Sequence, residues 1–186
     1  MTGPARVIGV ALAIPEPYGT ELQDWRERLG DPLAPVIPTH VTLLPPITVD
    51  ESVLPEIENH LRSVAEDEQT FDIELRGTGT FRPVSPVVFV QLARGIGGCE
   101  RLEQRVRSGP LARDLPFPYH PHVTVAHDVA DEALDRAFVE LAGYTAEFSV
   151  WGFSLYEHVE GVWRPQRDFP LGRELPGPVP ADFGQA

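Results

Sequence analysis

The sequence predicts an α+β protein made of two similar halves, each with the order strand, helix, strand, helix, strand, strand. His-Val-Thr occurs twice, at His40–Thr42 and at His122–Thr124, and each copy begins a short apolar stretch after a Pro-rich link. The opening runs of the halves also match, because Val7–Ala13 reads VIGVALA and Val87–Ala93 reads VVFVQLA. Such self-similarity indicates a duplication, and we expect two lobes in a pseudo-twofold arrangement around a central cleft.

The elements of the first half follow from the spacing of its apolar residues. The alternation at Phe71–Leu75 is typical of a strand, and Asp50 can cap a helix that begins at Glu51. Prolines lack the N–H that a strand needs, so Pro45-Pro46 is expected to end the first His-Val-Thr strand. The predicted elements are a strand at 6–14, a helix at 16–29 stopped by Gly30, a strand at 40–44, a helix at 51–65, and strands at 71–75 and 77–81.

The second half repeats this order and adds an edge strand. Its predicted elements are strands at 87–93, 122–126, 148–150, 153–157 and 162–169, with helices at 98–107 and 131–141. We therefore expect one bilobal domain over 1–172, with lobes near 1–84 and 85–172 whose terminal strands can exchange. The Pro/Gly-rich tail at 173–186 is expected to be poorly ordered.

Composition narrows the class of protein. The chain has 186 residues, 42% of them hydrophobic, and a formal net charge of −13. This acidic balance argues against stable binding of long nucleic acids, because proteins that bind them usually have a positively charged surface. There is a single cysteine and no apolar run long enough to span a membrane, and the start lacks the layout of a signal peptide. We expect a cytoplasmic protein without a membrane association, monomeric in solution.

The two His-Val-Thr motifs carry the predicted chemistry. Residues i and i+2 of a strand point to the same face, so His40 lies beside Thr42, and His122 beside Thr124. Two such pairs facing each other suit acid–base chemistry on a phosphate, where one histidine accepts a proton, the other donates one, and the hydroxyls hold anionic oxygens. Either motif alone is typical of an ordinary half-buried strand, and the pairing of two is what points to a site.

Other residues near the motifs leave alternatives open. His120 and His122 could form a metal pair, but His127 has the wrong parity to be a third ligand, so no metal is expected. Candidates for substrate binding are aromatic side chains that could stack on a base and arginines that could contact phosphate; the alternatives are core packing and solvated surface. These candidates are Phe81, Arg82, Tyr119, Tyr156 and Arg164. Cys99 is expected to be structural.

The chain resembles the two-histidine (2H) phosphoesterase superfamily, which includes bacterial RNA 2′,3′-cyclic phosphodiesterases, also known as 2′-5′ RNA ligases. The resemblance covers residues 5–171, and the segments HVTLLPP at 40–46 and PHVTVAH at 121–127 carry most of it. It implies two antiparallel sheets lining a groove, with His40, Thr42, His122 and Thr124 at the floor and no required cofactor. Many RNA-directed members carry basic residues around these motifs, which are missing here.

The resemblance implies a metal-independent phosphodiesterase acting on a 2′,3′-cyclic phosphate or a related nucleotide or RNA-end phosphoester. Reversible 2′-5′ RNA ligase activity is a further activity that the resemblance implies, with the roles of the two histidines reversed in ligation. We assign His122 as the base for water and His40 as the acid for the leaving oxygen, although the symmetry leaves the opposite assignment open. An ADP-ribose cyclic phosphate is a second substrate class. The alternative function is a non-catalytic nucleotide or RNA-end binding protein on the same fold.

Overall fold

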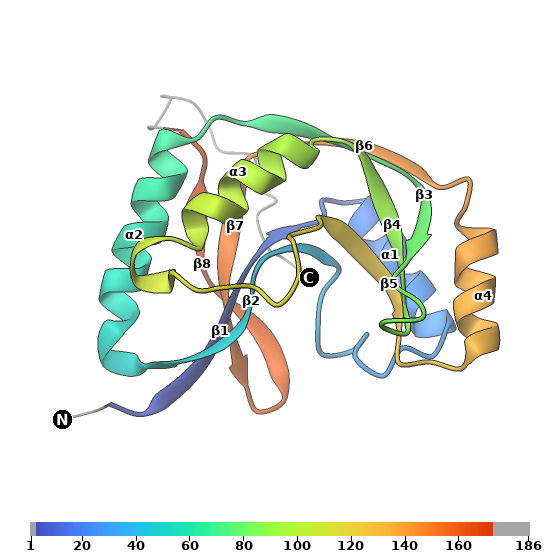
Figure 1. The fold of residues 1–186 in the computed structure, drawn as a ribbon, viewed down its shortest axis with the longest axis horizontal. Helices are drawn as coiled ribbons and strands as arrows, with labels where there is room; N and C mark the ends of the chain where they lie inside the picture. Colours follow the sequence, from blue (N-terminus) through green and yellow to red (C-terminus); the bar gives the residue numbers. More distant parts are fainter. Residues whose placement is uncertain (1–2, 173–186) are drawn as a thin grey trace.

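A computed structural model describes residues 3–172 as an α+β fold (Figure 1). The tail at 173–186, expected to be poorly ordered, lies outside the described residues. The strands are β1 (Ala5–Ala13), β2 (His40–Asp50), β3 (Phe71–Thr80), β4 (Val87–Arg94), β5 (His122–His127), β6 (Thr145–Val150), β7 (Gly152–Val159) and β8 (Val162–Pro170). The α-helices are α1 (Tyr18–Arg28), α2 (Leu54–Asp67), α3 (Ile96–Val106) and α4 (Asp131–Glu140), and short 3₁₀ turns lie at Glu51–Val53 and Gly109–Leu111.

The strands form one eight-stranded antiparallel sheet in the order β6-β3-β4-β5-β2-β1-β7-β8. The resemblance had implied two sheets. Here the two groups of four strands are joined where β2 meets β5, at the register pair Val41–Val123. The two strands that carry His-Val-Thr are therefore central neighbours in the sheet. The duplication itself stays a prediction.

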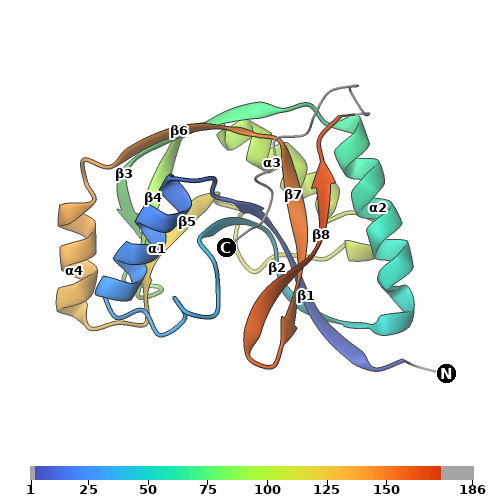
Figure 2. The ribbon, with the colours of Figure 1, turned by 180° about the vertical axis from the view of Figure 1, so that it is seen from behind.

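Strands and helices cross between the two halves of the sequence. Strand β3 of the first half pairs with β4 and β6 of the second, while β7 of the second half pairs with β1 of the first. Helix α3 packs on β2 and helix α1 packs on β5, and Figure 2 shows α1 and α4 together beside β3, β4 and β5. Each His-Val-Thr strand is thus contacted by a helix from the other half of the chain, and β5 is also contacted by α4 of its own half.

The prediction that Pro45-Pro46 ends the first motif strand is wrong. Strand β2 continues through both prolines to Asp50. Its register against β1 shifts between the pairs Ile8–Ile47 and Val10–Leu44, which places the prolines in an irregular stretch of the ladder. Proline is tolerated at such a bulge because no ladder hydrogen bond is needed from its nitrogen.

The predicted break between 71–75 and 77–81 is also absent, because β3 runs unbroken over Phe71–Thr80. Gly77 has φ +70°, a conformation that favours glycine, and the register against β4 shifts between Leu75 and Thr78. The N–H of Gly77 donates to the carbonyl oxygen of Tyr144 at 3.0 Å. A bulge therefore bends the strand without ending it.

The core lies between the sheet and its helices. Its apolar side chains come from the inward faces of the strands and from one stripe of each helix, as the periodicity predicted. Fully buried members include Ile8, Leu22, Leu61, Leu102 and Phe153. Within residues 3–172, no helix is long and apolar enough to cross a membrane.

Candidate active site

The two His-Val-Thr motifs meet at the centre of the sheet. Val41 and Val123 are both fully buried, while the flanking histidines and threonines are half-buried on the opposite face. Because the strands are antiparallel and Val41 pairs with Val123, His40 lies across from Thr124 and Thr42 lies across from His122. The two histidines are then diagonal neighbours, for which a sheet gives about 7–8 Å between Cα atoms. Two imidazoles at that separation are suited to contact one phosphate.

Each motif histidine is oriented by the backbone two residues earlier. Nδ1 of His40 lies 2.6 Å from the carbonyl oxygen of Pro38, and Nδ1 of His122 lies 2.7 Å from that of His120. A carbonyl oxygen only accepts, so each Nδ1 carries a proton and donates it. The other ring nitrogen, Nε2, is the atom left for exchange of a proton with a substrate.

Both histidines resist protonation in the folded protein. Burial lowers the pKa of His40 below its ordinary 6.5, and the Arg26 cation lowers it further, against the opposing hydrogen bond to Pro38. Burial also lowers the pKa of His122, and His120 and His40 act in the same direction. That His40 influences His122 agrees with their closeness. Neutral imidazoles therefore predominate at neutral pH in the free protein.

A cavity of about 260 Å³ opens beside the motifs and is lined by His40, Thr42 and Thr124. Its floor is strand β1, where Gly9 and Ala11 leave space; Ala11 pairs with Thr42. The walls are mostly apolar, and they include Leu33, Ile37, Leu44, Pro46, Tyr156 and Trp163. The motif side chains that line the cavity are those of His40, Thr42 and Thr124; among the described residues, His122 is not part of the lining.

On the β4 side of the two motifs, aromatic side chains occupy the space that is open on the β1 side. Phe89 on β4 pairs with Thr124, just as Ala11 on β1 pairs with Thr42. The Phe89 ring lies over Gly79, where an added Cβ would be 2.6 Å from it, and its centroid is 4.6 Å from that of Phe81. Phe81 in turn meets the His122 ring edge-on at 4.9 Å. The small side chain of Ala11 thus leaves a cavity next to His40, whereas Phe89 and Phe81 form an aromatic wall next to His122.

The predicted substrate-binding residues lie in different places. Tyr156 lines the cavity, and Phe81 contacts His122, so both belong to the site region. Tyr119 packs against the core and donates its hydroxyl to the carbonyl oxygen of Thr42 at 2.8 Å, which makes it a support for β2. Arg82 forms an ion pair with Asp135 of α4 at 2.8 Å. Arg164 is exposed on β8, paired in register with Glu157.

His120 and Cys99 lie outside the cavity lining. The His120 ring packs edge-on against Phe81 at 5.6 Å, and no three His, Cys, Asp or Glu of the described chain gather as metal ligands would. Cys99 is buried, and burial raises the pKa of its thiol to about 12. A thiol so rarely ionised is a poor nucleophile, which agrees with its expected structural role.

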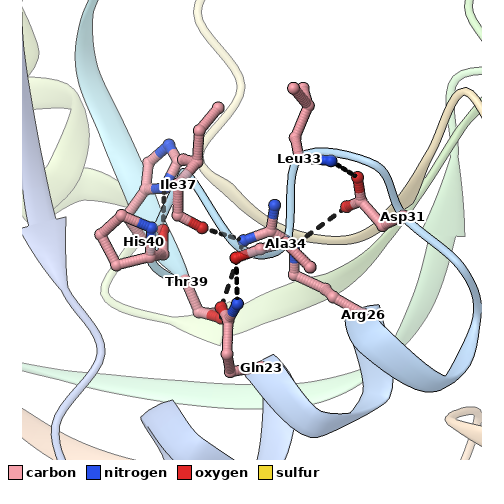
Figure 3. A network of polar contacts seen from close by, with 9 residues as sticks. Gln23, Arg26, Asp31, Leu33, Ala34, Ile37, Thr39 and His40 are labelled. Atoms are coloured by element: carbon pink, nitrogen blue, oxygen red, sulfur yellow. Dashed lines mark hydrogen bonds and ion pairs between the residues drawn. The ribbon is translucent and has the colours of Figure 1, made fainter. Parts of the chain in front are cut away.

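A buried polar network holds the loop that leads into His40 (Figure 3). Arg26 of α1 forms an ion pair with Asp31 at 3.0 Å and donates from Nη1 to the carbonyl oxygen of Ile37 at 2.5 Å. Arg26 and Asp31 are each 4% exposed. Gln23 accepts from the Thr39 hydroxyl at 3.0 Å and donates to the carbonyl oxygen of Ala34. The loop is therefore fixed at several points within reach of His40.

Sequence reasoning missed this network and the floor of the cavity. A signal for Arg26 was present, because it stands between Leu22 and Leu29 on the apolar stripe of α1, where a charge needs a buried partner. No local signal marked Gly9 and Ala11, since small residues in an apolar strand are unremarkable until their cross-strand neighbours are known.

The arrangement has recognised counterparts. A family model described as the 2′-5′ RNA ligase superfamily matches residues 14–162. A protein of Halalkalibacterium halodurans, provisionally named a phosphoesterase, is 29% identical over 169 residues, covering 89% of this chain and 98% of the relative. These matches extend over both His-Val-Thr motifs.

Solved structures share the fold. Apo LigT of E. coli superposes with a TM-score of 0.69 at 21% identity, covering 92% of this chain and all (100%) of LigT. The E. coli LigT structure complexed with 3′-AMP gives a TM-score of 0.60 at 20% identity, covering 91% of this chain and 100% of LigT. At this identity the likeness establishes the fold, and the chemistry rests on the residues of this chain.

Proposed function

The chain belongs to the 2′-5′ RNA ligase superfamily, the 2H phosphoesterases, and on that premise we propose that it is a metal-independent phosphodiesterase. Its substrate in this proposal is a 2′,3′-cyclic phosphate or a related nucleotide or RNA-end phosphoester. The observation that carries the proposal is the juxtaposition of His40 and His122, each with Nδ1 tied to a backbone carbonyl and Nε2 left for proton transfer.

The mechanism divides the work between the two imidazoles. Water attacks phosphorus, one histidine takes the proton that water loses, and the other protonates the ribose oxygen as its bond to phosphorus breaks. In the assignment made from the sequence, His122 is the base and His40 the acid. Each step of this kind contributes roughly 10²–10⁴-fold to the rate. With a ribose 5′-hydroxyl in the place of water as the nucleophile, the same ring opening would form a 2′-5′ linkage, and the reverse step would cleave that linkage to the cyclic phosphate.

In this mechanism, the hydroxyls of Thr42 and Thr124 stabilise the negative charge of the transition state. They lie on the same face as the histidines, each across from the imidazole of the other strand. Donors placed there can hold the non-bridging oxygens of phosphate, where negative charge grows as water attacks. Both threonines line the cavity, so a phosphate at its mouth would meet them.

The cavity has room for the base of a nucleoside on one side of the phosphate. Its volume of about 260 Å³ lies below the roughly 300–1,000 Å³ of whole-ligand sites, so it suits a part of a ligand such as a base. Trp163 and Tyr156 give aromatic walls, and stacking on aromatic rings tolerates any base. The LigT complex with 3′-AMP belongs to the same fold and favours a small nucleotide.

A non-catalytic binding protein is the competing function. It would use the same cavity but would have little need for two histidines with their Nδ1 protons fixed and Nε2 free. Loss of both imidazoles would then hardly alter its affinity for a nucleotide. The two functions therefore differ in how the histidine variants behave.

The test is hydrolysis of nucleoside 2′,3′-cyclic phosphates by wild type, His40→Ala and His122→Ala, each with and without EDTA. We expect activity that survives EDTA and falls by at least about 10²-fold in both variants. The control is His60→Ala, whose Nε2 lies 3.1 Å from the carbonyl oxygen of Val106, away from the motifs. Activity lost with EDTA would overturn the metal-independent mechanism. Absence of turnover, with undiminished nucleotide binding by the variants, would favour the binding protein.

A further inference from the structure

The loop between α1 and β2 is held differently from the corresponding loop before β5. Before His40, the fixed points are close to the histidine, because Arg26 binds the carbonyl of Ile37 and Gln23 binds Thr39. Before His122, Arg107, which directly follows α3, makes a comparable contact, but it reaches the carbonyl of Arg113, far along the chain from the histidine. Within residues 3–172, a buried ion pair ties the first loop to α1 next to its motif histidine, whereas Tyr119 ties the second loop to β2 next to His122.

The Arg26–Asp31 pair is the anchor of that support. Its side chains are 5% and 0% exposed, and Asp31 also accepts from the N–H of Leu33 at 2.9 Å. The guanidinium links helix α1 to Ile37, which precedes Pro38 in the chain. The carbonyl of Pro38 then holds Nδ1 of His40 at 2.6 Å. A continuous chain of contacts therefore runs from α1 to the His40 ring, as Figure 3 shows.

We propose that Arg26, with Asp31, Gln23 and Thr39, is a positioning residue for His40: it fixes the loop that holds the Nδ1 proton and thereby aims Nε2 at the phosphate. The inference rests on the proposed function for its kinetic consequence, although the orientation of the ring can be tested without turnover. The network fixes the tautomer and direction of one imidazole, while His122 depends on its own backbone contact with His120.

The network also shapes the charge around His40. The titratable groups that face this histidine are Arg26 and Asp31 from α1 and its loop, His122 and His127 from β5, and Tyr156 from β7. Arg26 is the nearby cation that opposes formation of the imidazolium. Replacing it by a neutral residue leaves the Asp31 carboxylate uncompensated, so the limb of the pH–rate profile that belongs to His40 should move to higher pH.

The first experiment reads the ring directly. Two-bond ¹H–¹⁵N correlation spectra of labelled wild type, Arg26→Lys and Thr39→Val are compared, with His40→Gln used to assign the His40 signals. We expect wild-type His40 in the neutral form with the proton on Nδ1, and signals averaged between the two tautomers in the variants. Unchanged His40 signals in both variants would overturn the proposal, whether or not the protein turns over any substrate.

The second experiment reads the kinetics of adenosine 2′,3′-cyclic phosphate hydrolysis. We expect Thr39→Val and Arg26→Leu to lower kcat by up to about 10²-fold with little change in KM, because a misaimed group costs rate rather than affinity. Arg26→Lys keeps the charge and should recover part of kcat. The matched control is Arg107→Leu, which removes an arginine paired with Glu103 before the other motif and should leave kcat near wild type.

The outcomes separate the explanations. A rise in KM at constant kcat would show that Arg26 contacts the phosphate and would overturn the positioning role. Equal losses in Arg26→Leu and Arg107→Leu would show general damage to folding and would also overturn it. Thr39→Val leaves the buried ion pair intact, so its result stands even if Arg26→Leu does not fold. Failure of the histidine variants to lose activity would count against the proposed function alone, because the tautomer readout is independent of it.

Discussion

Val41 of β2 and Val123 of β5 are directly paired at the centre of the sheet, and both side chains are fully buried. Their pairing sets the geometry of the candidate site on the other face. His40 faces Thr124 across the strands, and Thr42 faces His122. The two motifs consequently form one cluster in which each imidazole lies beside a hydroxyl from the other motif.

The threonines should matter to the rate more than to binding. We expect Thr42→Val and Thr124→Val each to lower kcat by on the order of 10²-fold with a small change in KM, since a donor to the developing charge acts chiefly in the transition state. Steady-state hydrolysis of a nucleoside 2′,3′-cyclic phosphate measures both constants. Thr48→Val, at an exposed position of the same strand, is the control. Full activity in both site variants would contradict this role.

The pH dependence follows from the lowered pKa of both histidines. A bell-shaped profile of kcat/KM needs one imidazole neutral and the other protonated, and the two pKa values of the free protein lie below 6.5. The optimum of kcat/KM is therefore expected below pH 6.5. Bound phosphate anion favours the imidazolium, so the kcat profile should lie at higher pH. An optimum of kcat/KM above pH 7.5 would contradict the buried environment of the two rings.

The same shifts link stability to pH. A histidine whose pKa is lower in the folded than in the unfolded protein, where it is about 6.5, is neutral in both states well above pH 6.5 and does not affect the free energy of unfolding there. As the pH falls from about 6.5 towards the folded pKa, the unfolded chain binds the proton more readily, and the folded protein loses stability. We expect the free energy of unfolding to decline on acidification below about pH 6.5. The double variant His40→Gln/His122→Gln should decline less over the same range. Urea unfolding at several pH values measures this, and parallel curves for both proteins would argue against it.

The buried ion pair should be costly to break from one side. We expect Asp31→Asn or Arg26→Leu to lower the free energy of unfolding by about 3–5 kcal/mol, because the remaining partner stays buried without its counter-charge. The double variant Arg26→Leu/Asp31→Leu should lose less than the two single changes together. The exposed pair of Arg136 and Glu140 is the control, and its removal should cost under about 1 kcal/mol. Denaturant unfolding measures all of these variants.

Gly9 should determine how much of a nucleoside the site accepts. An added Cβ at Gly9 would lie 3.3 Å from the carbonyl oxygen of Leu44 and 3.5 Å from the Trp163 ring, so alanine nearly fits and valine fills the cavity. Gly9→Val is expected to raise KM for nucleoside 2′,3′-cyclic phosphates at least about tenfold but to leave ribose 2,3-cyclic phosphate unaffected. Gly143→Ala, where a Cβ meets nothing within 4 Å, is the control. Equal effects on both substrates would place the base elsewhere.

Much of the fold was predictable because its signals are local. Alternation and helical spacing identified the strands and helices, and Gly30, with φ +77°, follows α1 at the predicted stop. The α+β class and the superfamily are confirmed. The predicted strand ends at Pro45-Pro46 and before Gly77 were wrong. Both lie at register shifts, where the partner strand determines whether the hydrogen-bond ladder continues.

For the candidate site too, some features follow from local sequence and others from contacts between distant residues. The sequence by itself determined which motif side chains share a face, since His-x-Thr in a strand puts an imidazole and a hydroxyl on one side whatever the rest of the chain does. Only the tertiary structure decided that β2 and β5 are neighbours, that Ala11 leaves a cavity where Phe89 fills one, and that Arg26 reaches the loop before His40. These are contacts between residues distant in sequence, and local periodicity carries no information about which distant elements pack together.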